Sequence, residues 1–170
     1  ELLVMPLPIM VPLRMTHLLP LLIYKKGTST IDNTGTLTAT NTVTNSGTFT
    51  NDGSFTAVDL ENKETSTFDN TGTLTATNTV TNSGTFTNET AGTLTASNTV
   101  TNYGTFTNDG SFTAVDLENK ETSTFDNTGT LTATNTVTNS GTFTNHASFT
   151  AADSETNQTS TYDNTRTLTA

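Results

Sequence analysis

Large apolar residues return at regular intervals along this chain, and each of them stands between polar neighbours. A strand with one buried face alternates apolar and polar residues with a period of two, so the pattern predicts short strands that recur once per repeat. The apolar residues form three columns, which are Leu37, Phe55, Leu74, Leu94, Phe112, Leu131, Phe149 and Leu168; Val43, Leu60, Val80, Val100, Leu117 and Val137; and the aromatic-rich Ile31, Phe49, Phe68, Phe86, Phe106, Phe125, Phe143 and Tyr162. The first and third columns advance in steps of 18 to 20 residues.

Three columns indicate three short strands per coil, joined by turns that Asn, Asp, Ser and Gly build. The predicted fold is all-β: a parallel β-solenoid of triangular cross-section, with 18 to 20 residues per coil and about eight coils. Residues 34–88 and 91–145 differ at only three positions, at an offset of 57, so part of the solenoid is duplicated. Each copy inserts Glu-Asn-Lys-Glu-Thr-Ser between two columns, which predicts a bulge or loop that preserves the core register.

One asparagine recurs in every coil at the same corner. Side-chain amides stacked about 4.8 Å apart can hydrogen-bond to each other or to the turn backbone, which predicts an asparagine ladder. The alternative is that asparagine stands there because it favours turns. The column consists of Asn33, Asn51, Asn70, Asn88, Asn108, Asn127, Asn145 and Asn164.

A glycine column follows the asparagines closely. Because glycine adopts positive φ without a steric penalty, the column predicts a left-handed turn in these coils. Its members are Gly35, Gly53, Gly72, Gly92, Gly110 and Gly129.

The first 24 residues differ from the rest, because they hold every proline and methionine and are otherwise mostly Leu, Ile and Val. Arg14, His17 and the prolines interrupt this apolar stretch, which disfavours a membrane span. We expect residues 1–17 to form a cap or a subunit-contact segment and residues 18–170 to form the solenoid domain, since a solenoid needs covered ends. The candidate contact residues are Leu2, Leu3, Val4, Ile9, Val11 and Leu13.

Composition narrows the classes of function. Only 31% of the chain is hydrophobic and it contains no Trp, so a thick globular core is disfavoured. Sixteen Asp and Glu against six Lys and Arg give a net charge of -10, which excludes the basic surface that nucleic acid requires. The absence of cysteine excludes disulfides and thiolate metal sites.

The strings Asn45-Ser-Gly-Thr-Phe-Thr-Asn-Asp-Gly-Ser-Phe-Thr-Ala57 and Gly35-Thr-Leu-Thr-Ala39 resemble coils of filamentous-haemagglutinin-like adhesins and related autotransporter passenger domains. The resemblance covers roughly residues 28–170. It implies a right-handed parallel β-helix exported to the bacterial surface. The expected function is therefore structural or adhesive, in an extracellular filament or surface adhesin, with further copies of the chain as partners end to end and glycans or surfaces as ligands.

Candidate chemistry is sparse. Asp69, Asp126 and Asp163 share an outward column but stand two or three coils apart, which separates them by roughly 10 Å or more and excludes a carboxylate dyad. Asp59 and Glu61 point outward together and could form a weak site for a hard cation such as calcium, but we favour the simpler explanation of a solvated strand face. We therefore expect no catalytic residue, metal or cofactor, and no enzyme activity.

Threonine forms ranks on one flat side, at Thr36, Thr38, Thr56, Thr73, Thr75, Thr93, Thr95, Thr113, Thr130 and Thr132. This Thr-x-Thr array resembles the face of ice-binding β-solenoids, which gives an alternative function. A further full threonine column that begins at Thr48 lies on another side, however, and threonine suits exposed strands in general.

Overall fold

The computed structural model describes residues 30–156, 161–164 and 168–169. All the regular secondary structure in these ranges is β-strand. The predicted cap at residues 1–17, its six candidate contact residues and the expected start of the solenoid at residue 18 lie outside the described residues. The described strands form three sides, which we name after their buried columns.

The Phe side buries the column from Ile31 to Tyr162. Its strands are β1 (Thr30–Asn33), β4 (Thr48–Asn51), β7 (Thr67–Asn70), β10 (Thr85–Asn88), β13 (Thr105–Asn108), β16 (Thr124–Asn127), β18 (Thr142–Asn145) and β20 (Thr161–Asn164).

The Leu side carries the column that begins at Leu37, and the Val side the column that begins at Val43. The Leu side consists of β2 (Thr36–Thr38), β5 (Ser54–Ala57), β8 (Thr73–Ala76), β11 (Thr93–Ala96), β14 (Ser111–Ala114) and β21 (Leu168–Thr169). The Val side consists of β3 (Val43–Asn45), β6 (Leu60–Asn62), β9 (Val80–Asn82), β12 (Thr99–Asn102) and β15 (Asp116–Asn119). Two longer strands, β17 (Thr130–Asn139) and β19 (Ser148–Thr156), run along the Leu side and then the Val side.

Strands of successive coils pair in parallel and in register, so the predicted parallel β-solenoid is confirmed. On the Phe side Phe49 pairs with Phe68, and on the Leu side Phe55 pairs with Leu74. The eight Phe-side strands form one sheet, and seven complete turns separate the first from the last, close to the eight coils predicted. Because β17 and β19 pass round a corner without a break, the Leu and Val sides join into a 13-stranded sheet.

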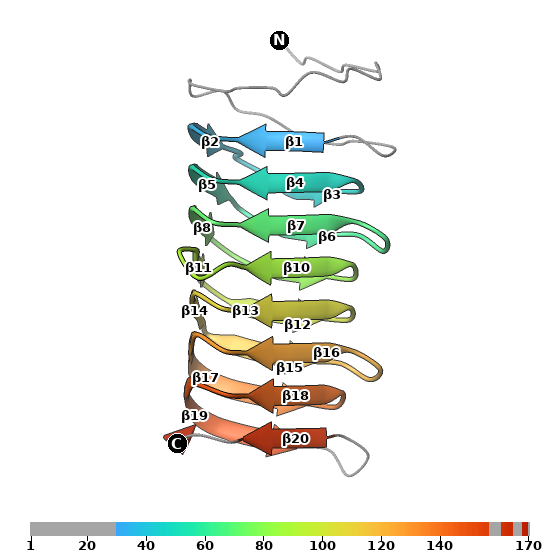
Figure 1. Cartoon of the computed structure of the whole chain (residues 1–170), viewed down its shortest axis with the longest axis vertical. Coiled ribbons are helices and arrows are strands. Elements are labelled where there is room, and N and C mark those ends of the chain that lie inside the picture. Colours follow the sequence, from blue (N-terminus) through green and yellow to red (C-terminus); the bar gives the residue numbers. More distant parts are fainter. Residues whose placement is uncertain (1–29, 157–160, 165–167, 170) are drawn as a thin grey trace.

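The coil is right-handed, as the adhesin resemblance implies. In Figure 1 the strands of the Phe side run to the left in front, the chain returns to the right behind them, and each coil lies below the one before. The twenty-one strands thus wind one elongated stack whose axis is perpendicular to the strands.

The core is a thin stack of single side chains. Consecutive Phe-side rings from Phe49 to Phe143 lie almost parallel, with centroids 4.7 to 5.1 Å apart. Each such pair contributes about 0.5 to 1.5 kcal/mol beyond the burial of its area. The Leu and Val columns complete the core, and Leu74, Phe112 and Val100 are fully buried. Each strand therefore contributes one large apolar side chain to the core.

The predicted insertions lie at the corner between the Val and Phe sides, where Figure 1 shows the turns after β6 and β15 extending beyond their neighbours. Lys63, Glu64 and Thr65 are exposed there, and Thr65 and its duplicate Thr122 have φ values of 63° and 64°. The register continues past the insertion because Thr67 still pairs with Thr48.

The glycine column has a different cause from the one predicted. None of the corner glycines Gly53, Gly72, Gly92, Gly110 and Gly129 has positive φ, so the predicted left-handed turn is wrong. Each glycine instead stacks on the backbone of the preceding coil: a Cβ at Gly53 would lie 2.1 Å from the carbonyl oxygen of Gly35, and one at Gly72 would lie 2.1 Å from that of Gly53. Close approach of successive turns excludes a side chain there.

Candidate functional site

The outward residues of the Leu side form a surface that we call the threonine face. Its hydroxyls stand in two in-register columns, and the structure places all ten candidate threonines in them. One column is Thr36, Ser54, Thr73, Thr93, Ser111, Thr130 and Ser148, and the other is Thr38, Thr56, Thr75, Thr95, Thr113, Thr132 and Thr150. Every member is exposed or half-buried, so the face is open along its length.

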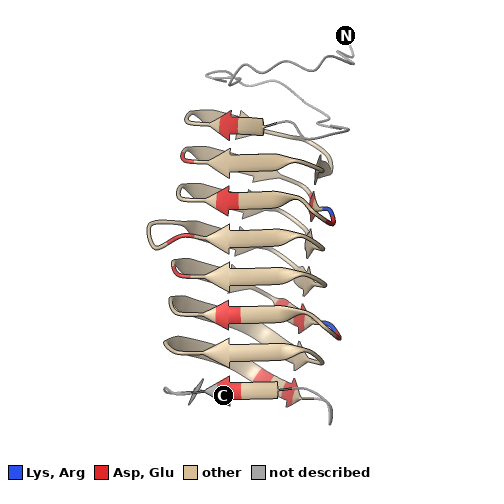
Figure 2. Ribbon diagram, turned by 45° about the vertical axis from the view of Figure 1, so that its right-hand side comes forward, with Lys and Arg blue, Asp and Glu red and all other residues tan. Residues whose placement is uncertain are grey.

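The threonine face carries no charge, whereas the rest of the described surface is acidic. Figure 2 shows the acidic residues as red segments on strands and at turns of the solenoid. On the Val side they are Asp59, Glu61, Asp116, Glu118, Asp153 and Glu155; on the Phe side Asp32, Asp69, Asp126 and Asp163; and at turns Asp52, Glu64, Glu89, Asp109 and Glu121. The Leu side therefore differs from the Val and Phe sides in its lack of charge. This difference is not apparent from the threonine columns alone.

The predicted asparagine ladder is confirmed at the corner that follows the Phe side. From Asn33 to Asn127, each Nδ2 donates to the Oδ1 of the asparagine in the next coil, at 2.6 to 2.8 Å, and Asn145 is the last acceptor. The same Nδ2 also reaches backbone carbonyls, as Asn51 does with Thr73 at 3.1 Å. The strand register pairs Asn164 with Asn145, and the structure does not describe the side chain of Asn164.

A second asparagine ladder, which the sequence analysis missed, runs along the corner that follows the Val side. Its rungs are joined from Nδ2 to Oδ1 at 2.8 to 2.9 Å and are 0 to 5% exposed. They are Asn45, Asn62, Asn82, Asn102, Asn119 and Asn139. The signal was present, because an asparagine stands two residues after every member of the Val column.

The second ladder also explains the serines of the insertions. In regular coils a backbone N–H donates to the amide oxygen of the ladder, as from Gly47 to Asn45 at 3.1 Å. In the inserted coil Ser66 lies at the glycine position, and its hydroxyl donates to Asn62 Oδ1 at 2.7 Å. Ser123 does the same in the duplicate, so the insertion preserves the second donor to the ladder.

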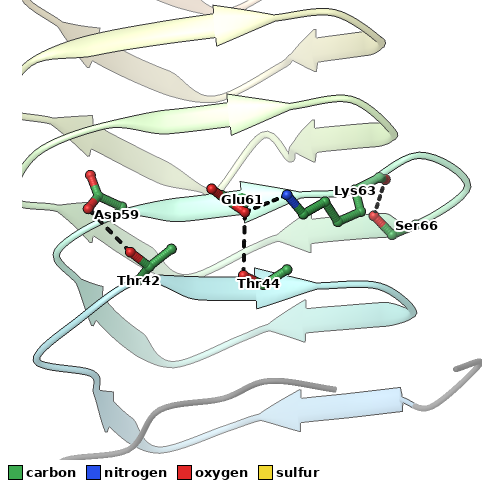
Figure 3. A network of polar contacts seen from close by, with 6 residues as sticks. All are labelled: Thr42, Thr44, Asp59, Glu61, Lys63 and Ser66. Carbon is green, nitrogen blue, oxygen red and sulfur yellow. Dashed lines mark hydrogen bonds and ion pairs between the residues drawn. The ribbon is translucent and has the colours of Figure 1, made fainter. Parts of the chain in front are cut away.

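The acidic pair on the Val side is engaged within the fold (Figure 3). Asp59 accepts hydrogen bonds from Asn78 Nδ2 at 2.8 Å, from Thr79 Oγ1 at 2.7 Å and from the Thr79 backbone N–H at 3.1 Å. Burial raises the pKa of Asp59, but these hydrogen bonds outweigh it and the pKa lies below its usual value. Glu61 forms an ion pair with Lys63, so both carboxylates already have partners within the fold.

The arrangement repeats three coils further on, where Asp116 accepts from Asn135 and Glu118 pairs with Lys120. No group of three or more His, Cys, Asp or Glu side chains in the described part of the chain could hold a metal ion. On the Phe side two threonines, Thr87 and Thr107, separate Asp69 from Asp126, which keeps the two carboxylates roughly 14 Å apart.

Comparison with protein-family models, curated proteins and solved structures gives no match to this chain. Among the residues that the structure describes, no helix is long and apolar enough to span a membrane. What the structure establishes is a repeat protein with a parallel β-solenoid fold, two asparagine ladders and three chemically distinct sides.

Proposed function

We propose that the chain is a stiff, adhesive rod in an extracellular filament or bacterial surface adhesin, and that it has no enzyme activity and uses no cofactor. The observation that carries this proposal is the continuity of the stack. Two asparagine ladders and a column of phenylalanine rings pass through consecutive coils without a gap, each over roughly 24 to 29 Å at about 4.8 Å per coil. Such an interior supports a long rod and leaves the outward columns free for weak contacts.

The proposed partner along the axis is a second copy of the chain. Each Phe-side strand between β1 and β20 pairs in parallel with a strand of the coil on either side of it. The same edge-to-edge pairing would let a second solenoid continue the stack.

Electron microscopy and sedimentation velocity of the purified chain test this assembly. Rods that lengthen with protein concentration support it, and monodisperse short rods at high concentration would overturn it. Surface exposure is tested separately by antibody labelling of intact producing cells, with and without brief protease treatment. Signal that appears only after lysis would contradict the extracellular location.

Ice binding is a second candidate, and the charge distribution favours it. The two hydroxyl columns of the threonine face are in register and contain no acidic residue, whereas each of the other two sides has at least one outward column with acidic residues. Thermal hysteresis of the purified chain is the measurement, and it should fall when Thr95 and Thr113 become charged. A wild-type chain without hysteresis ends this candidate.

A further inference from the structure

We propose that the threonine face docks on the flat surface of an uncharged polysaccharide. This inference rests on the adhesive role proposed above and names the chemistry of its ligand. The three sides of the solenoid surround the same interior and differ in their outward residues. The outward residues therefore decide which side can bind this ligand.

Charge is the first argument. A carboxylate pressed against an uncharged partner loses hydration and gains no counter-charge, which is costly. Contact through the Val side would bury pairs such as Asp59 and Glu61, and contact through the Phe side would bury Asp69 and Asp126. Among the described residues, only the Leu side has outward columns without a carboxylate, so a neutral ligand can cover these columns without this cost.

Hydrogen-bonding capacity is the second argument. Each threonine or serine hydroxyl can donate one hydrogen bond and accept two, as a sugar hydroxyl can. Along a strand the two columns are roughly 6.6 Å apart, and between coils the spacing is about 4.8 Å, so the face presents a regular lattice of such groups. The threonine methyl groups add apolar contacts that suit the C–H faces of sugar rings.

Rigidity is the third argument. Threonine is restricted at χ1, and the residues beneath the face, among them Leu74, Leu94 and Phe112, are fully buried. A surface that is already ordered loses little entropy when it binds.

A second copy of the chain fits this face less well. Six steps of about 4.8 Å by four residues of about 3.3 Å give roughly 400 Å² per rod. That is about half of the 800 Å² that each partner contributes to a standard stable interface. Binding to an extended polysaccharide surface does not depend on a single small contact, because many threonine faces along a filament bind to the same surface at once.

The test is depletion of the purified chain from solution by microcrystalline cellulose and by chitin particles. The site variant is T73E/T93E, which places two charges in adjacent strands of the threonine face. The matched control is T85E/T105E on the Phe side, where both threonines are likewise exposed and in register. Both pairs add the same charge, and circular dichroism with urea unfolding checks that both variants fold. If either pair does not fold, the single variants T93E and T105E replace them.

We expect the wild type and the control to bind at least one kind of particle, and the site variant to lose about tenfold or more in partitioning. Binding should persist in 0.5 M salt, a condition that screens electrostatic attraction. No binding by the wild type, or equal loss in both variants, would overturn the inference. Thermal hysteresis without retention on particles assigns the face to ice and likewise overturns it. Rods seen by microscopy without particle binding would leave the structural function standing and remove only this ligand.

Discussion

Removal of one rung from an asparagine ladder should destabilise the coils on both sides of it, and Asn108 is the most informative position. Its amide donates to Asn127 Oδ1 at 2.7 Å and to Thr130 O at 3.1 Å, and it accepts from Asn88 Nδ2 at 2.8 Å. Asn108→Ala deletes these three hydrogen bonds, at about 1 kcal/mol each, and leaves the buried oxygen of Asn127 without its ladder donor, which costs about 1 to 3 kcal/mol more. We therefore expect a loss of about 4 to 6 kcal/mol.

Urea unfolding followed by circular dichroism measures the loss, and amide hydrogen exchange in β10, β13 and β16 locates it. The control is Thr107→Ala, one residue away but outward and half-buried, which should cost about 1 kcal/mol or less. In the double variant N108A/N127A the orphaned oxygen is gone, so the total should fall short of the sum by about 1 to 3 kcal/mol. Equal losses for Asn108→Ala and Thr107→Ala, or strict additivity in the double variant, would refute the ladder as a source of stability.

Four further predictions concern the core, the insertions and two of the carboxylates. Phe106→Ala should cost about 3 to 5 kcal/mol in urea unfolding and Phe106→Leu about 1.5 kcal/mol, since the ring lies fully buried between two others. Thr122→Gly should stabilise the chain by about 1 kcal/mol because it relieves a positive φ of 64°, and an unchanged unfolding midpoint would contradict this. The lowered pKa of Asp59 means that its stabilising effect is present at neutral pH and is lost as the pH falls through the folded-state value, so Asp59→Asn should weaken the fold at pH 7 and little at pH 2. Burial raises the pKa of Asp69, so that carboxylate opposes folding at neutral pH and Asp69→Asn should stabilise at pH 7 but not at pH 2; the opposite order in either pH series would contradict the assignment.

The fold was predictable because the spacing of the apolar residues and the alternation of their polar neighbours both indicate the same strands in every coil. Apolar residues such as Phe49 and Phe68 recur at the coil length, and the alternation of polar neighbours defines which face is buried. The insertion that contains Lys63 was recognisable because the apolar columns continue beyond it. A register slip of one residue would turn the whole apolar column outward, so the hydrophobic pattern alone fixes how the coils stack.

The polar interior was only partly predictable. Asn45 stands two residues after Val43 and so shares its inward phase, but the sequence does not show whether the strand continues as far as this asparagine or has already passed into the turn. The glycine column posed the same difficulty, since a requirement for positive φ and a requirement for close approach leave the same residue in the sequence. Gly53 is needed because the carbonyl of Gly35 would touch its Cβ, a contact between coils that only coordinates reveal.

The internal duplication shows which positions of a coil can change while its interior stays the same. Its two copies differ at Thr34 and Ala91, at Thr40 and Ser97, and at Ser46 and Tyr103. All of these residues lie in turns between strands, and none belongs to a buried column, a ladder or the threonine face. Because strand residues alternate between the interior and the surface, a change in an outward residue leaves the ladders and the phenylalanine stack intact. The same interior can therefore carry surfaces of different charge on its three sides, which is what a rod that binds through one side and keeps the other two acidic requires.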